Sequence, residues 1–118
     1  MIRIIAWLLI SATTTATVYN ATPEQCGNHP TITASGRRIE GDVSDLRILA
    51  MERTMMARHG IQYGDTVLVR GAGAYDGEWI VEDTMSRRYA GTDRVDFLVP
   101  DDVRLGRWDN VEIYKRSE

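Results

Sequence analysis

The feature that most constrains the fold is a series of short β-prone runs over the second half of the chain, separated by turn signals. Residues 78–82 alternate between polar and apolar side chains, which places Trp79 and Val81 on one face of a strand. The dipeptide Asp76-Gly77, just before this run, is a hairpin signal. Further strands are predicted over residues 66–70, 94–99 and 108–114, the last with Val111 and Ile113 facing inward. Short strands at this spacing indicate a small barrel or sandwich.

Fewer strands and helices are predicted in the first half of the chain. Residues 16–20 have the composition of a short strand, and residues 31–34 are expected to restart extended structure after a loop. Residues 47–51 are expected to form a strand, followed by one or two helical turns over residues 54–59. The helix is expected to end there because Gly60 stands at a C′ position. The methionines of this region are interpreted as core filler: Met51, Met55 and Met56.

The N-terminus has the pattern of a secretory leader. Arg3 gives a positive start, residues 4–10 are continuously apolar, and small residues follow. The apolar run is too short for the roughly 20 residues that span a bilayer as a helix. We therefore predict a signal peptide over residues 1–16, cleaved near Ala12 or Ala16, and one domain over residues 17–118. The alternative is that the apolar run forms a first buried strand.

This leader predicts a secreted, periplasmic or cell-envelope protein, with membrane contact only through an uncleaved leader. A net charge of −3, with the 14 Lys and Arg residues scattered, argues against a nucleic-acid partner. No cofactor is predicted, since the sequence shows no nucleotide-binding loop. The single Cys26, with His29 nearby, is too sparse for a zinc site, so no metal is predicted and Cys26 is interpreted as a buried apolar residue.

Two carboxylates are the strongest candidates for chemistry. Asp83 follows directly on a predicted strand, and Asp96 lies inside another, between apolar neighbours. Alternation places Asp96 on the same face as Arg94 and Leu98. Burying a carboxylate without partners is costly, and a raised pKa in such a place would make Asp96 a candidate general acid. The alternative is an exposed strand-face aspartate paired with an arginine.

A set of motifs in a fixed order carries a family resemblance. Their order and spacing, from about residue 16 to residue 114, resemble the three-aspartate (3D) domain, a double-psi β-barrel module. That domain is related to the catalytic barrel of membrane-bound lytic transglycosylase A and, more distantly, to rare lipoprotein A and expansins. The resemblance implies a mainly β fold, a small six-stranded double-psi β-barrel with one short helix. The motifs are Thr33-Ala34-Ser35-Gly36, Gly64-Asp65-Thr66-Val67, Gly77-Glu78-Trp79-Ile80-Val81-Glu82-Asp83-Thr84, Arg94-Val95-Asp96-Phe97 and Gly106-Arg107-Trp108.

The resemblance also implies roles for the two carboxylates. Asp96 matches the family's general acid/base, which protonates the glycosidic oxygen and then takes a proton from the muramyl 6-hydroxyl as an anhydro ring closes. One carboxylate serves both steps, unlike the paired carboxylates of glycoside hydrolases. Asp83 would hold the groove and raise the pKa of Asp96 by like-charge proximity.

The segment between the two aspartates departs from the family pattern. The family has a Gly-Gly-Ala-Ile-Lys-Gly stretch there, whereas residues 85–93 are two residues longer and match it only at Gly91. Arg87, Arg88 and Tyr89 in this segment are expected to contact glycan and peptide carboxylates, or another protein. The predicted substrate site is completed by Thr33, Thr84 and Arg94 of the matched motifs.

Large aromatic side chains are candidates to flank a sugar site. Tyr19, Trp79 and Trp108 are the residues that would stack on apolar sugar faces. The alternative for each tryptophan is packing in the core or at its rim, since such side chains bury large areas in any case.

Two functions remain open on the sequence. The first is an exported, cell-wall-active barrel that cleaves peptidoglycan glycan strands, as a lytic transglycosylase does. The second is a non-catalytic barrel that binds the cell wall or serves as a structural or docking module with a protein assembly partner, including a phage-encoded, virion-associated protein. The second function stays open because a transglycosylase usually has a second domain that closes off a deep cleft, and 118 residues leave no room for one.

Overall fold

The computed structural model describes residues 6–21, 32–39, 42–103 and 105–117. In this part of the chain the fold is mainly β, with six strands and one short α-helix. Two single 3-10 turns, η1 (Gly73–Tyr75) and η2 (Arg87–Tyr89), interrupt the loops. The main elements are β1 (Ala6–Tyr19), β2 (Ile48–Met51), α2 (Arg53–His59), β3 (Thr66–Arg70), β4 (Gly77–Thr84), β5 (Arg94–Leu98) and β6 (Arg107–Ser117).

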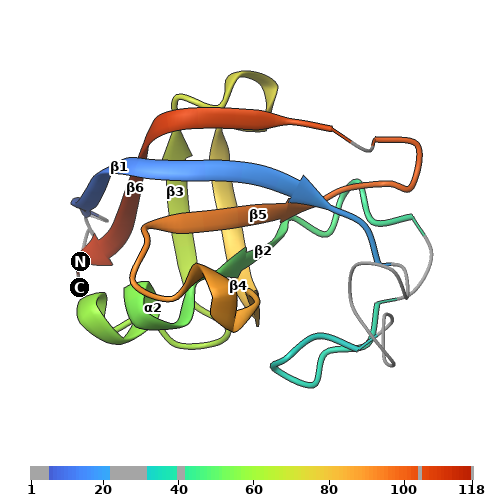
Figure 1. Ribbon diagram of the computed structural model, residues 1–118, viewed down its shortest axis with the longest axis horizontal. Helices are drawn as coiled ribbons and strands as arrows, with labels where there is room; N and C mark the ends of the chain where they lie inside the picture. The colour runs from blue at the N-terminus through green and yellow to red at the C-terminus, as the bar shows by residue number, and fades with distance from the viewer. Residues whose placement is uncertain (1–5, 22–31, 40–41, 104, 118) are drawn as a thin grey trace, which may run out of the picture.

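The six strands form one sheet that closes into a ring. Their order is β1-β5-β2-β4-β3-β6, and β6 pairs back onto β1. The pairs β1–β5 and β2–β4 are parallel, and the other four are antiparallel. In Figure 1, β6, β1 and β5 run side by side across the view, while β3 and β4 run steeply behind them. Closure leaves the ring without the free sheet edges that invite aggregation.

The strand order has an internal two-fold pattern. Exchanging β1, β2 and β3 for β4, β5 and β6 leaves every neighbour in the ring, and every parallel or antiparallel relation, unchanged. In the ring, β5 lies between β1 and β2, and β2 lies between β4 and β5, so each of these two connections crosses one strand in the topology. The ring is thus built from two topologically equivalent halves with two equivalent crossovers.

Apolar side chains fill the inside of the ring. Phe97 lies at the centre of an aromatic group, with ring centroids 4.6 Å from Trp79, 5.4 Å from Tyr75 and 5.9 Å from Trp108. The inward positions predicted by alternation are confirmed, since Trp79, Val81, Val111 and Ile113 are all buried in this core.

A second apolar cluster lies on the outer face of β2 and β5. Ile48 and Ala50 of β2 belong to it, whereas Leu49 and Met51 point into the ring, so β2 is buried on both faces. The segment around Ile39 and residues 43–46 covers this cluster. The outer face therefore has a rigid apolar base on which polar groups can be positioned.

Several predicted elements are confirmed. The strand predicted over residues 66–70 is β3, and the strand followed by a short helix before Gly60 is β2 and α2. Gly60 caps the helix in the left-handed conformation, with φ of 66° and its N–H bonded to the Met56 carbonyl. Met51 and Met55 are fully buried and Met56 packs against the core. β3 and β4 form the hairpin that Asp76-Gly77 signalled.

Extended structure was expected over residues 31–34, and the structure describes residues 32–34 of this stretch. Within the described residues, Ile32 makes only an isolated bridge to Arg38, and the chain turns at once. Local hydrogen bonds explain the turn, because the Thr33 hydroxyl accepts from the Arg37 N–H at 3.1 Å and the Thr33 carbonyl accepts from the Gly36 N–H at 2.9 Å. The interpretations of Cys26 and His29 lie outside the described residues.

The N-terminal segment is more extensive than the strand predicted over residues 16–20. β1 begins at Ala6 and pairs with β6 from Ala6↔Ser117 to Thr17↔Arg107. Residues 6–16, which the sequence assigned to a leader, are therefore part of a strand, as in the alternative interpretation of the N-terminus. The side chains of Leu8 and Leu9 remain 51% and 45% exposed. The leader itself stays a prediction.

Glu52, which is 1% exposed, caps α2 and gives a first prediction. Burial raises its pKa, but hydrogen bonds from Thr54 and Met55 outweigh burial and lower it overall. A carboxyl whose pKa is lowered by folding contributes stability above its unfolded pKa, and the contribution is lost as pH falls through the folded value. Glu52→Ala is expected to cost about 1–3 kcal/mol at pH 7, because it leaves buried N–H groups without acceptors.

The measurement is urea unfolding at pH 7 and at pH 3. The difference in the free energy of unfolding between the native protein and Glu52→Ala should be smaller at pH 3 than at pH 7. Glu52→Gln is the matched control, since it keeps one carbonyl acceptor without a titrating charge. An equal difference in the free energy of unfolding at both pH values would contradict the role of the ionised Glu52 carboxylate as the helix cap.

Candidate functional site

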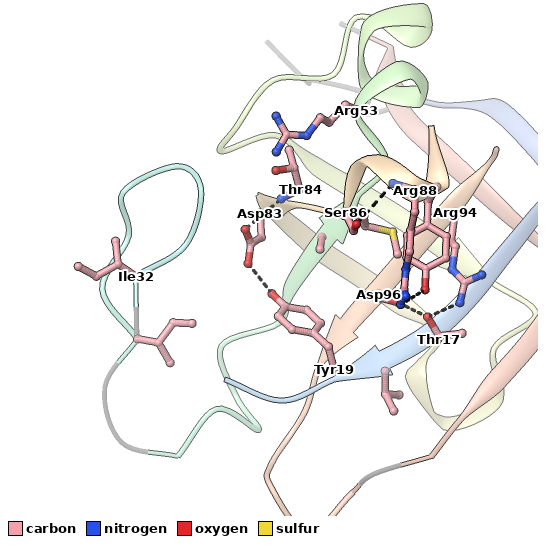
Figure 2. A pocket seen from close by; sticks show the side chains of 15 residues that line it. Thr17, Tyr19, Ile32, Arg53, Asp83, Thr84, Ser86, Arg88, Arg94 and Asp96 are labelled. Carbon is pink, nitrogen blue, oxygen red and sulfur yellow. Dashed lines mark hydrogen bonds between the residues drawn. The ribbon is translucent and has the colours of Figure 1, made fainter. Parts of the chain in front are cut away.

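The outer face of the ring carries a groove of about 530 Å³ between the two crossovers. Its floor comes from β1, β2, β4 and β5, and its sides come from residues near Ile32 and Ile39 and from residues 85–89. Figure 2 shows the side chains of several strands and loops converging on this space.

A row of residues in register crosses the floor of the groove. Thr17 of β1 pairs with Asp96 of β5, Asp96 pairs with Ala50 of β2, and Ala50 pairs with Asp83 of β4. Two strand spacings put the backbones of the two aspartates about 10 Å apart. Because Ala50 has only a methyl group, the space between the carboxylates stays open.

The carboxyl group of Asp96 has a raised pKa. Burial raises its pKa, opposed by the Thr17 hydrogen bond and by the charges of Arg94 and Arg88, with Asp83 adding a small upward contribution. The Thr17 hydroxyl donates to Oδ1 of Asp96. Among the described residues, none of the ion pairs includes Asp96. Like-charge proximity to Asp83 is therefore the minor cause of the raised pKa, and desolvation the major one.

Asp83 is held by neutral donors. Its Oδ1 accepts from the N–H groups of Ala34 and Thr84, both at 3.0 Å, and its Oδ2 accepts from the Tyr19 hydroxyl at 3.1 Å. Tyr19 comes from β1 and Ala34 from the loop after it, so this carboxylate joins three segments that are distant in the sequence. Asp83 thus acts as an anchor for the wall of the groove.

Replacing this anchor gives a second prediction. Asp83→Ala removes three hydrogen bonds to one carboxylate and is expected to cost about 2–4 kcal/mol and to free the loop around Ala34. Asp83→Asn keeps an acceptor for the two N–H groups, and its amide can donate to the Tyr19 oxygen, so a much smaller effect is expected.

Hydrogen exchange of the Ala34 and Ser35 amides, combined with thermal unfolding, checks this prediction. Faster exchange in the alanine variant but not in the asparagine variant is the expected pattern. Equal exchange in all three proteins would show that the loop does not depend on Asp83.

One wall of the groove is made of two arginines and a tyrosine. The guanidinium carbons of Arg94 and Arg88 lie 4.2 Å and 4.8 Å from the centroid of the Tyr89 ring. Nη2 of Arg88 also donates to the Tyr89 hydroxyl at 2.7 Å. Nη2 of Arg94 makes a long contact of 3.5 Å to Thr17, while its buried Nε has no partner. We call this group the Arg-Tyr wall.

The structure brings most of the predicted site residues together. Seven of them line the groove: Tyr19, Asp83, Thr84, Arg88, Tyr89, Arg94 and Asp96. Thr33 is buried against Ser35 beside the groove, and Arg87 is exposed on η2, and neither is among the described lining residues. Trp79 lies inside the ring at 3% exposure and Trp108 packs against the same core, so the alternative of core packing describes both.

Eight lining residues were not foreseen as site residues from the sequence: Thr17, Val18, Ile32, Ile39, Ala50, Arg53, Met85 and Ser86. Thr17 lies two residues before Tyr19, so alternation along β1 would have placed both on one face. Ala50 and Arg53 carry no comparable signal, because their positions depend on which strands become neighbours in the ring.

Within the described residues, no cluster of three or more His, Cys, Asp or Glu side chains could hold a metal ion. No α-helix in that part of the chain has the length and apolar character required to cross a bilayer. Comparisons with protein-family models, curated proteins and solved structures give no match to this chain.

Proposed function

We propose that the chain is a double-psi β-barrel of the 3D type that acts on the cell wall and cleaves peptidoglycan glycan strands, with Asp96 as general acid/base. The observation that carries this proposal is a largely desolvated carboxyl with a raised pKa in an open groove. A raised pKa keeps a larger fraction of this carboxyl protonated at a given pH than in an exposed aspartate, which favours a general acid. The closed ring with equivalent halves and two crossovers supports the fold assignment.

The proposed chemistry needs one carboxyl group. Asp96 gives its proton to the glycosidic oxygen as the bond from that oxygen to C1 breaks. The muramyl 6-hydroxyl oxygen then bonds to C1 and its proton passes to the Asp96 carboxylate, which restores the acid. The nucleophile is part of the substrate, in keeping with an Asp83 whose two oxygens are already occupied by hydrogen bonds.

The test is to incubate the full chain with purified peptidoglycan and to analyse the soluble products by mass spectrometry. Products ending in 1,6-anhydromuramyl sugars are expected. Products with reducing ends would indicate hydrolysis by water instead, and their appearance would overturn the transglycosylase mechanism.

The second candidate is a non-catalytic barrel that binds cell-wall glycan or docks onto a protein assembly, including a virion. It is favoured by the Thr17 hydroxyl, which occupies one oxygen of Asp96. Sedimentation with insoluble peptidoglycan, without release of soluble products, would support this function. In either case we propose an exported or cell-envelope location, which detection of the protein in secreted or periplasmic fractions would test.

A further inference from the structure

The groove contains cations that its own carboxylates do not pair. Arg53, Arg88 and Arg94 line it together with Asp83 and Asp96. In the described ranges, the ion pairs are made by other residues, such as Arg58 with Asp93 and Arg37 with Glu82. Asp83 is satisfied by neutral donors, so its hydrogen bonds do not engage the guanidinium groups. The groove therefore presents positive charge that a ligand can neutralise.

The Arg-Tyr wall orients this charge. Stacking on Tyr89 holds the planes of two guanidinium groups, and stacked arginines keep their N–H edges available for planar oxyanions. The unpartnered Nε of Arg94 is a buried donor that lacks an acceptor, which is unfavourable until one is supplied. Figure 2 shows Arg88 and Arg94 grouped beside Asp96 and Thr17, on the opposite side of the groove from Asp83.

We propose that the Arg-Tyr wall binds a carboxylate carried by the glycan, so that the groove selects acidic over neutral sugar chains. This inference rests on the proposed function and names the substrate class of the same site. Carboxylates are favoured because a guanidinium donates two parallel hydrogen bonds to them. Arg94 lies two residues before Asp96 on the same face of β5, so the acidic group would sit next to the bond to be cleaved.

Two parts of peptidoglycan carry suitable carboxylates. One is the free lactyl group of a muramyl sugar without its peptide, and the other is the peptide stem. The shared chemistry is a carboxylate within reach of the glycan backbone, and the experiment separates the two sources.

The experiment measures glycan binding by isothermal titration calorimetry on full-length Asp96→Asn, which binds without turnover. The probes are neutral chitotetraose, a peptide-free tetrasaccharide of alternating N-acetylglucosamine and N-acetylmuramic acid, and the same tetrasaccharide with peptide stems. At least one acidic probe is expected to bind about 10-fold or more tightly than chitotetraose, as charged hydrogen bonds of this kind provide. Tight binding of only the stem-bearing probe would assign the carboxylate to the peptide.

Substitutions within η2 provide the matched control. Arg88→Gln is expected to remove most of the preference for the acidic probe over chitotetraose. Arg87→Gln changes the same net charge on the same turn but outside the groove, and should leave both affinities as they are. Arg94→Lys keeps the charge but loses the planar fork, and should lower the preference in part.

Three outcomes overturn the inference. Equal affinity for neutral and acidic probes overturns it while leaving the proposed function intact. Equal effects of Arg87→Gln and Arg88→Gln would show that net charge alone is responsible. Failure of every glycan to bind would overturn the proposed function as well. Thermal unfolding of each variant confirms that the titrated protein is folded.

Discussion

Asp96→Asn is expected to lower the rate of glycan cleavage by about 10²- to 10⁴-fold, the range that a positioned general acid/base contributes. The substitution removes the proton donor and changes little else in shape. The asparagine carbonyl can still accept from the Thr17 hydroxyl, and the neighbouring Ala50 leaves room for the amide. The measurement is the initial rate of release of anhydromuropeptides at equal protein concentration.

The same substitution is expected to stabilise the fold at neutral pH, by on the order of 1 kcal/mol, as changes at destabilised functional positions often do. Burial raises the pKa of Asp96, so the folded protein binds more protons than the unfolded chain between the ordinary and the raised pKa. Stability from this group is therefore present below its unfolded pKa and lost as pH rises through the folded pKa. The advantage of the variant should appear above that range and vanish in acid.

Asp102→Asn is the matched control, because Asp102 is exposed in the loop between β5 and β6 and outside the groove. It should change neither rate nor stability. A variant at Asp96 that is less active and also less stable would indicate a structural role for this carboxyl. An active Asp96→Asn protein would exclude it as the general acid. If Asp96 is the general acid, the rate of cleavage by the native protein should fall as pH rises through its raised pKa.

Removal of residues 1–16 is expected to abolish cooperative folding, which is the largest stability effect predicted for this chain. The truncation leaves only Thr17–Tyr19 of β1, and with it β6 loses most of its partner strand. Thr14 and Ala16 are fully buried, so their loss opens the ring on one side. The net stability of a small domain is about 5–15 kcal/mol, too little to absorb the loss of most of one strand.

A polar cluster fixes the removed segment to the rest of the fold. The Ser11 hydroxyl donates to Oδ2 of Asp93 at 2.7 Å, and Thr14 donates to Ser11 at 2.8 Å. Nη2 of Arg58 contacts the other Asp93 oxygen at 2.6 Å. Burial opposes ionisation of Asp93, but its hydrogen bonds from Ser11 and Arg58 lower its pKa overall. The contacts of Ser11 and Thr14 are lost when residues 1–16 are removed.

Circular dichroism during thermal unfolding compares three proteins: the full chain, a chain that begins at Ala6, and a chain that begins at Thr17. The chain from Ala6 keeps every described contact of β1 and should unfold like the full chain. A chain from Thr17 with a cooperative transition would instead support the prediction of a cleaved leader. Ser11→Ala in the full chain should cost about 1–3 kcal/mol, by leaving Asp93 and Thr14 short of a partner.

Local patterns were sufficient for much of the fold. Alternation identified the inward faces at Trp79, Val81, Val111 and Ile113, because side chains of a strand point to opposite faces whatever its neighbours are. Gly60 marked the end of α2 because a left-handed cap requires a residue without a Cβ penalty. The row of residues across the groove could not be obtained this way, because it depends on pairing between strands distant in the sequence.

The remaining differences have similar causes. The extended structure expected before the turn near Ser35 is limited in the described residues to a bridge at Ile32, because side-chain to backbone hydrogen bonds close the turn at once. Trp79 and Trp108 were candidate sugar-stacking residues, but the ring needed them to fill its interior around Phe97. Both Asp83 and Asp96 line the groove, although alternation had placed Asp96 only with Arg94 and Leu98. Their chemical activity is for the cleavage experiment to decide.

The two-fold strand order has a consequence for how such a protein can change. The two crossovers that border the groove are equivalent in the topology, yet the one after β1 covers an apolar cluster and the one after β4 supplies Arg88 and Tyr89 of the Arg-Tyr wall. The described residues of the two crossovers contribute no strand to the ring, so insertions and deletions there leave the strand pairing intact. A ring of this kind could therefore change its ligand preference through two loops while its strand pairing stays the same.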